Sequence, residues 1–217
     1  MKNKSYYFFI SLVLLILAFA GCRKVESHYY ADETTPGTAI FTNTGNNVMT
    51  TLFNGHPWRT VERSSGGVGL GSGYTTELQI IKLKTASTLD TLVITWKSDD
   101  YNQDNYDISL VLPVAKNFTW NNFSSFQGKR FTIDSTNGFF ALTHDYYNFY
   151  NQLNLTAGKG SVYFNTAYLD SSSVSGVGFR GRISGLLEAS INANGINAVI
   201  SSGRFDDALT SGEVRSY

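Results

Sequence analysis

The chain has 217 residues, and its 17 Lys and Arg residues balance its 17 Asp and Glu residues. This balance leaves no basic field that would attract nucleic acid through charge alone. A single cysteine excludes an internal disulfide. A chain of this length is sufficient for one domain with a sizeable core.

The first element in chain order is a short apolar run, Tyr6 to Ala20, which two lysines precede and Gly21-Cys22 follows. This layout is typical of a bacterial secretory signal. A helix of these 15 residues would span roughly 23 Å, less than the ~30 Å of hydrocarbon in a bilayer, which disfavours a transmembrane anchor. The segment resembles a lipobox, which implies cleavage after Gly21, acylation of Cys22 and export toward the outer membrane. Phe19 stands where such signals usually carry Leu, so an ordinary secretory signal with an incidental cysteine is the alternative.

The expected organisation follows from this segment. Residues 1–21 form the predicted signal peptide, residues 22–38 a flexible tether without periodicity, and residues 39–217 a β-domain. Removal of the signal leaves 15 basic residues against 17 acidic ones, a net charge of about −2. With Cys22 acylated, for instance by palmitate, the domain has no thiol for catalysis or metal binding.

The composition of the domain favours strands, because Tyr, Phe, Thr, Val and Ile are frequent and Pro is rare. Leu92, Ile94 and Trp96 alternate with the residues between them over 91–96, and the alternation resumes over 108–112, which predicts a hairpin across the polar loop between them. No window of helical length has a 3.6-residue period. About nine or ten strands are expected. The fold class is therefore all-β, either a single antiparallel β-sandwich or a partly open β-barrel.

The clearest strand signal is the alternation over 177–191, where every second residue is apolar or glycine. Asn194-Gly195 follows at once, a dipeptide typical of a type I′ hairpin turn. A turn at this dipeptide places Ile191 opposite Ala198 and Ala189 opposite Ile200. The apolar faces of both strands then coincide, so the register is predicted as well as the hairpin.

Two short motifs bracket most of the mature chain. Phe53-Asn54-Gly55-His56-Pro57-Trp58 resembles the N-G-K-P-W opening of an uncharacterised family of small Bacteroidota-type lipoproteins, with His in place of the more usual Lys. Ser202-Gly203-Arg204-Phe205-Asp206 resembles the end of that family's closing hairpin. The resemblance implies a location and a fold type, and it implies no activity.

The acidic loop between the two central strands is the candidate cation site. Carboxylate and amide oxygens suit Ca²⁺, and the loop sequence SDDYNQDNYD offers four carboxylates: Asp99, Asp100, Asp104 and Asp107. The glycine and closing glutamate of an EF-hand are missing, so a solvated hairpin loop is the favoured interpretation. No P-loop and no G-x-S-x-G motif is present. We therefore predict no metal, no cofactor and no catalytic residue.

Clustered aromatic residues are the candidate ligand-binding groups. Trp120, Phe123, Tyr146 and Tyr147 could stack on sugar rings if exposed, although packing is the favoured interpretation. The expected function is that of a lipid-anchored protein of the cell envelope, at the outer membrane, with a non-enzymatic β-domain in an accessory or binding role. A module that binds carbohydrate, or a small apolar ligand in a lipocalin-like barrel, is the alternative. A hydrolase whose carboxylates carry no sequence signature is the third.

Overall fold

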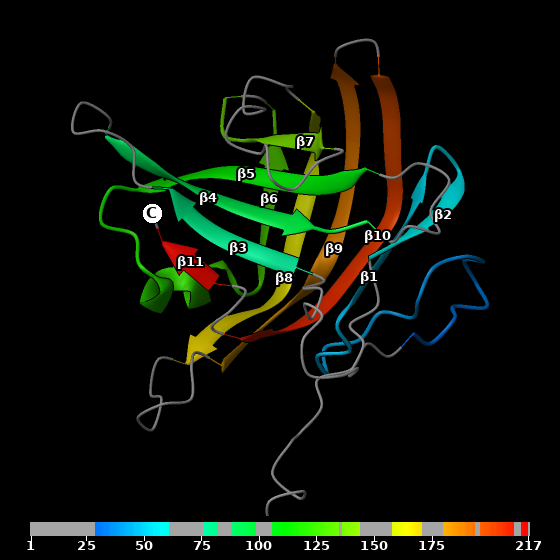
Figure 1. Ribbon diagram of the computed structural model, residues 1–217, viewed down its shortest axis with the longest axis horizontal. Helices are drawn as coiled ribbons and strands as arrows, with labels where there is room; N and C mark the ends of the chain where they lie inside the picture. Colours follow the sequence, from blue (N-terminus) through cyan, green and yellow to red (C-terminus); the bar gives the residue numbers. More distant parts are fainter. Residues whose placement is uncertain are drawn as a thin grey trace, which may run out of the picture.

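The long strands of the C-terminal half organise the larger of two sheets (Figure 1). The computed structural model describes residues 29–60, 76–81, 88–98, 106–134, 136–143, 158–170, 180–193, 196–210 and 214–216. Within these ranges the chain forms eleven strands and one short 3-10 helix. The larger sheet has the strand order β2 (His56–Arg59), β1 (Val48–Phe53), β10 (Ile196–Thr210), β9 (Arg180–Ala193), β8 (Lys159–Asp170) and β6 (Lys129–Ile133).

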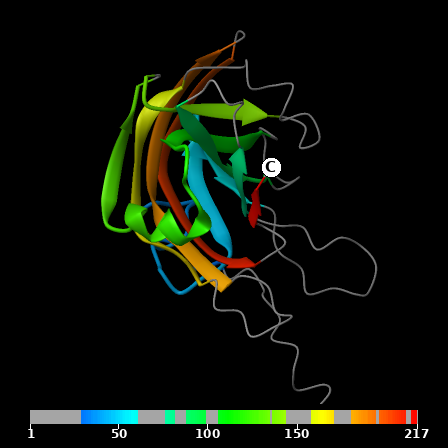
Figure 2. The same ribbon diagram turned by 90° about the vertical axis from the view of Figure 1, so that its left-hand side faces the viewer.

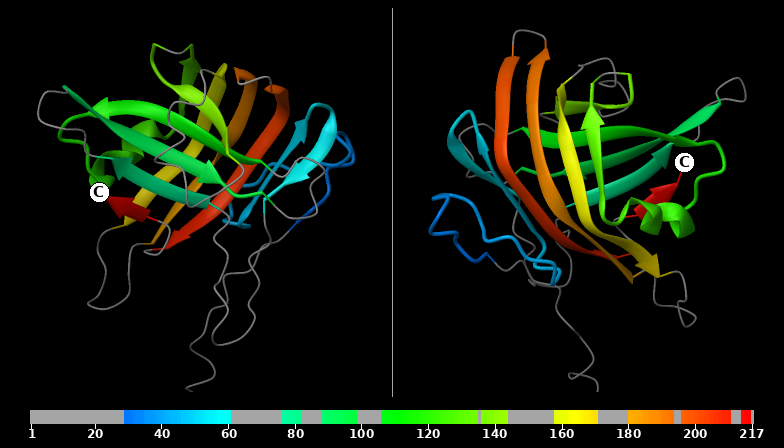
Figure 3. Two further views of the ribbon diagram at one scale, coloured as in Figure 1. Left: turned by 45° about the horizontal axis from the view of Figure 1, so that its top comes forward. Right: turned by 180° about the vertical axis from the view of Figure 1, so that it is seen from behind.

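The smaller sheet crosses the larger one at a steep angle (Figures 1 and 3). Four of its strands are antiparallel, and β11 is added to β3 in parallel. Its order is β11 (Val214–Ser216), β3 (Thr76–Ile81), β4 (Leu89–Trp96), β5 (Asp107–Ala115) and β7 (Phe139–Thr143). The sequence predicts fewer strands because β2 and β11 have only four and three residues, too few to show an alternation.

The two sheets form a sandwich, and in the described residues they do not close into a barrel. Backbone pairing between the sheets is limited there to two isolated bridges, Thr60 with Ser98 and Phe140 with Gly158. The predicted all-β class is confirmed, and the sandwich is the correct one of its two forms. The lipocalin-like alternative required a closed barrel, so its structural condition is not met.

Large apolar side chains from both sheets fill the space between them. The ring centroids of Trp96 and Phe205, one from each sheet, are 5.1 Å apart. The indole Nε1 of buried Trp58 donates to the Tyr106 carbonyl at 3.1 Å, which ties β2 to the residue that precedes β5 of the smaller sheet. The interior of the sandwich is therefore a packed core.

Both predicted hairpins are present, and the one with a predicted register has that register. Ile191 pairs with Ala198 and Ala189 with Ile200 in the β9–β10 ladder, and β4 pairs with β5 as expected. Gly185 lies on the inward face of β9, where a Cβ atom would be 1.9 Å from a backbone oxygen of β8 and 2.5 Å from the Phe205 ring. Only glycine fits there, because the two backbones and the ring approach too closely for a side chain.

The 3-10 helix, η1 (Trp120–Phe126), packs against β8 at one end of the sandwich (Figure 2). Its three aromatic rings at 120, 123 and 126 are all buried. Phe126 stacks on Phe164 of β8 with a centroid distance of 5.6 Å. The packing interpretation is therefore correct for this cluster.

Candidate functional site

The outer face of the larger sheet carries charged residues where β10 runs beside β1. Arg204 and Asp206 lie on this face, since inward-facing Phe205 separates them and strand side chains alternate. Residues 29–47, which we call the docked N-terminal segment, run along the β1–β2 side of the larger sheet (Figure 3) and contact Arg204 and Asp206 of β10. The two charges hold two different parts of the segment.

Asp206 binds the second half of the docked N-terminal segment. The residue is 3% exposed, and its carboxylate accepts hydrogen bonds from the backbone N–H groups of Thr44 at 3.0 Å, Gly45 at 2.8 Å and Asn46 at 3.3 Å. The Thr42 hydroxyl donates a fourth hydrogen bond to the same carboxylate. Successive N–H groups that converge on one anion form a compact binding loop, here with an anion supplied by the protein itself.

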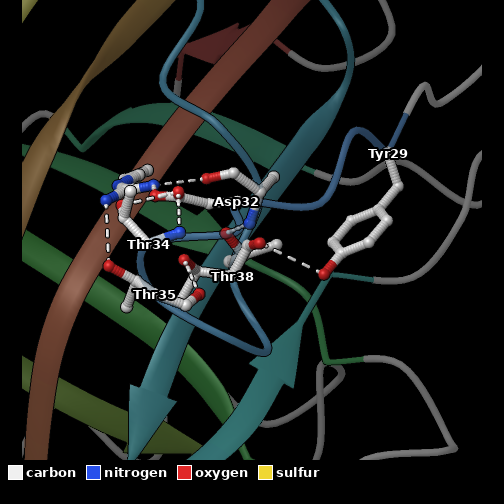
Figure 4. Close-up of polar contacts among 8 residues, drawn as sticks. Tyr29, Asp32, Thr34, Thr35 and Thr38 are labelled. Atoms are coloured by element: carbon white, nitrogen blue, oxygen red, sulfur yellow. Dashed lines mark hydrogen bonds and ion pairs between the residues drawn. The ribbon is translucent and has the colours of Figure 1, made fainter.

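Arg204 binds the first half of the segment (Figure 4). Its guanidinium forms an ion pair with Asp32 and donates to the Ala39 carbonyl at 2.7 Å. The other carboxylate oxygen of Asp32 accepts hydrogen bonds from the hydroxyl of Thr34 at 2.7 Å and from its N–H at 2.8 Å. The hydrogen bond from the Thr34 hydroxyl, followed by the one from Arg204, holds the pKa of Asp32 well below its ordinary value of 3.8.

Further contacts extend along the segment. The Ala39 N–H donates to the buried hydroxyl of Thr50 on β1 at 2.8 Å, and Arg182 of β9 donates to the Asn43 carbonyl at 2.7 Å. The Asn47 side chain accepts from the Ala208 N–H of β10 at 3.0 Å. Within the predicted tether over 22–38, Asp32 and Thr35 contact Arg204 of the sheet, and residues 22–28 lie outside the described part.

A depression of about 220 Å³ lies beside the segment on the same sheet. It forms where the β9–β10 register shifts between Ile200 and Gly203, at a bulge that contains Ser202 with a φ of 53°. Arg130 reaches over the Tyr163 ring at 5.7 Å and donates to the Ser161 hydroxyl at 3.2 Å. The lining of the depression includes Arg130, Ser161, Leu186, Glu188, Ser202 and Arg204.

Three of the predicted site residues lie in the described part of the chain: Asp107, Trp120 and Phe123. Trp120 and Phe123 are buried in the core, which makes them wrong as ligand-binding candidates, because their rings are not available for stacking. Asp107 accepts the Ser98 N–H at 2.8 Å, a contact that closes the base of its loop. Cys22, Asp99, Asp100, Asp104, Tyr146 and Tyr147 lie outside the described residues. Across the described ranges, no group of three or more His, Cys, Asp and Glu side chains could hold a metal ion.

Sequence reasoning missed the pairs formed by Asp32 with Arg204 and by Asp206 with the loop that it binds. The sequence feature that could have indicated them is the pair Arg204 and Asp206, two charged residues at alternate positions of a strand within the motif 202–206. The first motif has a structural role as well. Asn54 and Gly55 have φ angles of 51° and 83° at the β1–β2 turn, and the Asn54 side chain accepts the Val199 N–H of β10 at 2.8 Å.

Comparisons with known proteins add no relative: no family model, curated protein or solved structure matches the chain. In the part of the chain that the structure describes, no helix is both long enough and apolar enough to cross a membrane.

Proposed function

We propose that this protein is a lipid-anchored lipoprotein of the cell envelope, at the outer membrane, whose β-sandwich has a non-enzymatic accessory or binding role. The observation that carries the proposal is the apolar run that ends in Ala20-Gly21-Cys22, only seven positions before the docked N-terminal segment begins at Tyr29. The expected lipid-acceptor cysteine and the docked N-terminal segment are thus only a few residues apart.

The length of that connection limits how far the domain can lie from its anchor. Seven residues, 22 to 28, precede Tyr29. Fully extended residues span at most ~3.3–3.6 Å each, so the connection reaches about 25 Å at most. An anchored domain would therefore stay beside the bilayer surface, in a restricted set of orientations.

The chemistry of the described surface favours an accessory or binding role over hydrolysis. The carboxylates of Asp32 and Asp206 are both committed to holding the docked N-terminal segment. The depression of about 220 Å³ is below the ~300–1,000 Å³ of ordinary small-molecule sites. Neither feature provides the paired carboxylates in a cleft that a glycosidase mechanism needs.

Acylation is the direct test of the anchor. Cells that express the full chain are labelled with a radioactive or clickable fatty acid, and the protein is compared with its Cys22→Ser variant. We expect label in the wild type and none in the variant. Equal label in both proteins, or no label in either, would refute the proposal that Cys22 carries a lipid anchor.

A binding module for one sugar ring is the second candidate. The depression combines an apolar floor at Leu186 with the hydroxyl-bearing Ser161 and Ser202 and the charged Glu188, groups that suit a polyhydroxylated ligand. Ligand-observed NMR with a panel of monosaccharides tests it. If the Glu188→Gln variant gives the same monosaccharide-binding signal as the control Asn197→Ala, whose substituted residue is exposed, the sugar does not bind in this depression.

A further inference from the structure

Exposed apolar side chains are concentrated in the docked N-terminal segment. Among the described residues seven large apolar side chains are exposed, and four of them are in this segment: Tyr29, Tyr30, Ile40 and Phe41. The other three are on three different strands of the two sheets. We call the four residues the N-terminal apolar patch.

Backbone contacts bring the two halves of this patch together. Ala31 and Ala39 form an antiparallel bridge, and the Ile40 N–H donates to the Tyr30 carbonyl at 2.8 Å. Tyr30 therefore lies opposite Ile40, and opposite residues of an antiparallel pair share one face. Tyr29 and Phe41 are one position away on each strand, so alternation places them on the other face of the same open hairpin end. Their exposed fractions, 55% and 44%, are the two highest of the four.

Hydrogen bonds hold the backbone on both sides of the patch. The Tyr29 hydroxyl donates to the Thr38 carbonyl at 3.2 Å (Figure 4). Arg204 donates to the carbonyl of Ala39, which precedes Ile40. Asp206 accepts from the hydroxyl of Thr42, which follows Phe41. An exposed apolar surface that is fixed in this way is typical of a contact site for a partner or a membrane.

We propose that the N-terminal apolar patch inserts into the interfacial region of the bilayer to which Cys22 is attached. This inference rests on the proposed lipid anchor, because it is the connection of about 25 Å that keeps the patch at the bilayer surface. Tyrosine suits this depth, since its ring is apolar and its hydroxyl remains near water. No Asp, Glu, Lys or Arg occurs at 29–31 or 39–42, so insertion of these residues would bury no charged side chain. Acyl chain and patch would then act as two attachments that fix the orientation of the domain.

A tryptophan reporter tests the contact. The three natural tryptophans are all buried, so a new exposed indole is read above a nearly constant background. Ile40→Trp is compared with Leu89→Trp, because Leu89 has the same exposed fraction of 44% but begins β4 of the smaller sheet. Phe41→Trp is a second reporter that preserves an aromatic side chain. The lipoproteins are purified from membranes and reconstituted into phosphatidylethanolamine–phosphatidylglycerol vesicles with brominated acyl chains.

We expect the tryptophan emission of Ile40→Trp and Phe41→Trp to shift to the blue in the vesicles and to be quenched by their brominated chains. The emission of Leu89→Trp should keep its wavelength and intensity in the same vesicles. If the proteins float with the vesicles and all three reporters are quenched equally, the patch proposal is wrong while the lipid anchor stands. If the proteins carry no acyl label and do not float, both proposals fail. A blue shift that depends on protein concentration and not on lipid would assign the patch to a second copy of the chain, which also overturns the membrane contact.

Discussion

Removal of the Asp206 carboxylate should release the second half of the docked N-terminal segment. Asp206→Ala deletes the acceptor of three backbone N–H groups and one hydroxyl at a position that is 3% exposed. A hydrogen bond to a charged group contributes about 1.5–3 kcal/mol. The released N–H groups can bind water, which recovers part of the four contributions. We therefore expect the free energy of unfolding to fall by about 3–5 kcal/mol.

This loss is large against the ~5–15 kcal/mol that stabilises a typical domain. It can be measured by equilibrium urea unfolding, followed through the emission of the three buried tryptophans. Asn197→Ala, at an exposed position of the same strand, is the matched control and should change stability by less than ~0.5 kcal/mol. A loss below about 1 kcal/mol in Asp206→Ala, the net value of a single ordinary hydrogen bond, would show that the carboxylate does not hold the segment.

Three further predictions follow from individual contacts. Folding lowers the pKa of Asp32 below its ordinary value of 3.8, so the stability that Asp32 contributes is complete above that pH and is lost as the pH falls below it, because the unfolded chain takes up the proton first. Urea unfolding at pH values on both sides of 3.8 should therefore show a steeper fall of the unfolding free energy with decreasing pH in the wild type than in Asp32→Asn. Equal pH dependence in the two proteins would contradict the pairing. Gly185→Ala places a Cβ atom 1.9 Å from a backbone oxygen and should cost about 3 kcal/mol of folding free energy, whereas a neutral result would mean that the two strands are further apart. Trp58→Phe leaves the Tyr106 carbonyl without the indole donor and should cost about 1–3 kcal/mol in the same assay, with an unchanged midpoint as the contrary result.

The hairpins were predictable because their information is local. The alternation over β9 marks which face is buried, and the adjacent Asn-Gly dipeptide marks the turn, so the pairing of Ile191 with Ala198 follows without knowledge of the rest of the fold. Alternation alone indicated β4 and β5, whose inward residues alternate in both strands, and it predicted their pairing without a register. Short edge strands such as β2 carry too few residues for this signal.

The docked N-terminal segment could not be predicted because its partners are distant in the sequence. Asp32 and Arg204 are separated by 172 positions, and the segment between Tyr29 and Thr38 has no alternation. A mixture of charge, Thr, Pro and Gly is common to flexible linkers and to irregular segments that polar contacts hold in place. The aromatic residues of η1 presented a similar ambiguity, since only the position of β8 decides that Trp120 and Phe123 are buried.

The residues from Tyr29 onward belong to the folded domain in this structure, so at most seven residues, 22 to 28, separate that domain from the expected anchor. Hydrogen–deuterium exchange of the purified lipoprotein tests this claim most directly, because the N–H groups of Asp32, Ala39, Ile40 and Gly45 all have acceptors in the folded structure. We predict that these four amides exchange slowly, as the amides of β10 do. Exchange of all four at the rates of an unstructured peptide would show that the segment is a free tether.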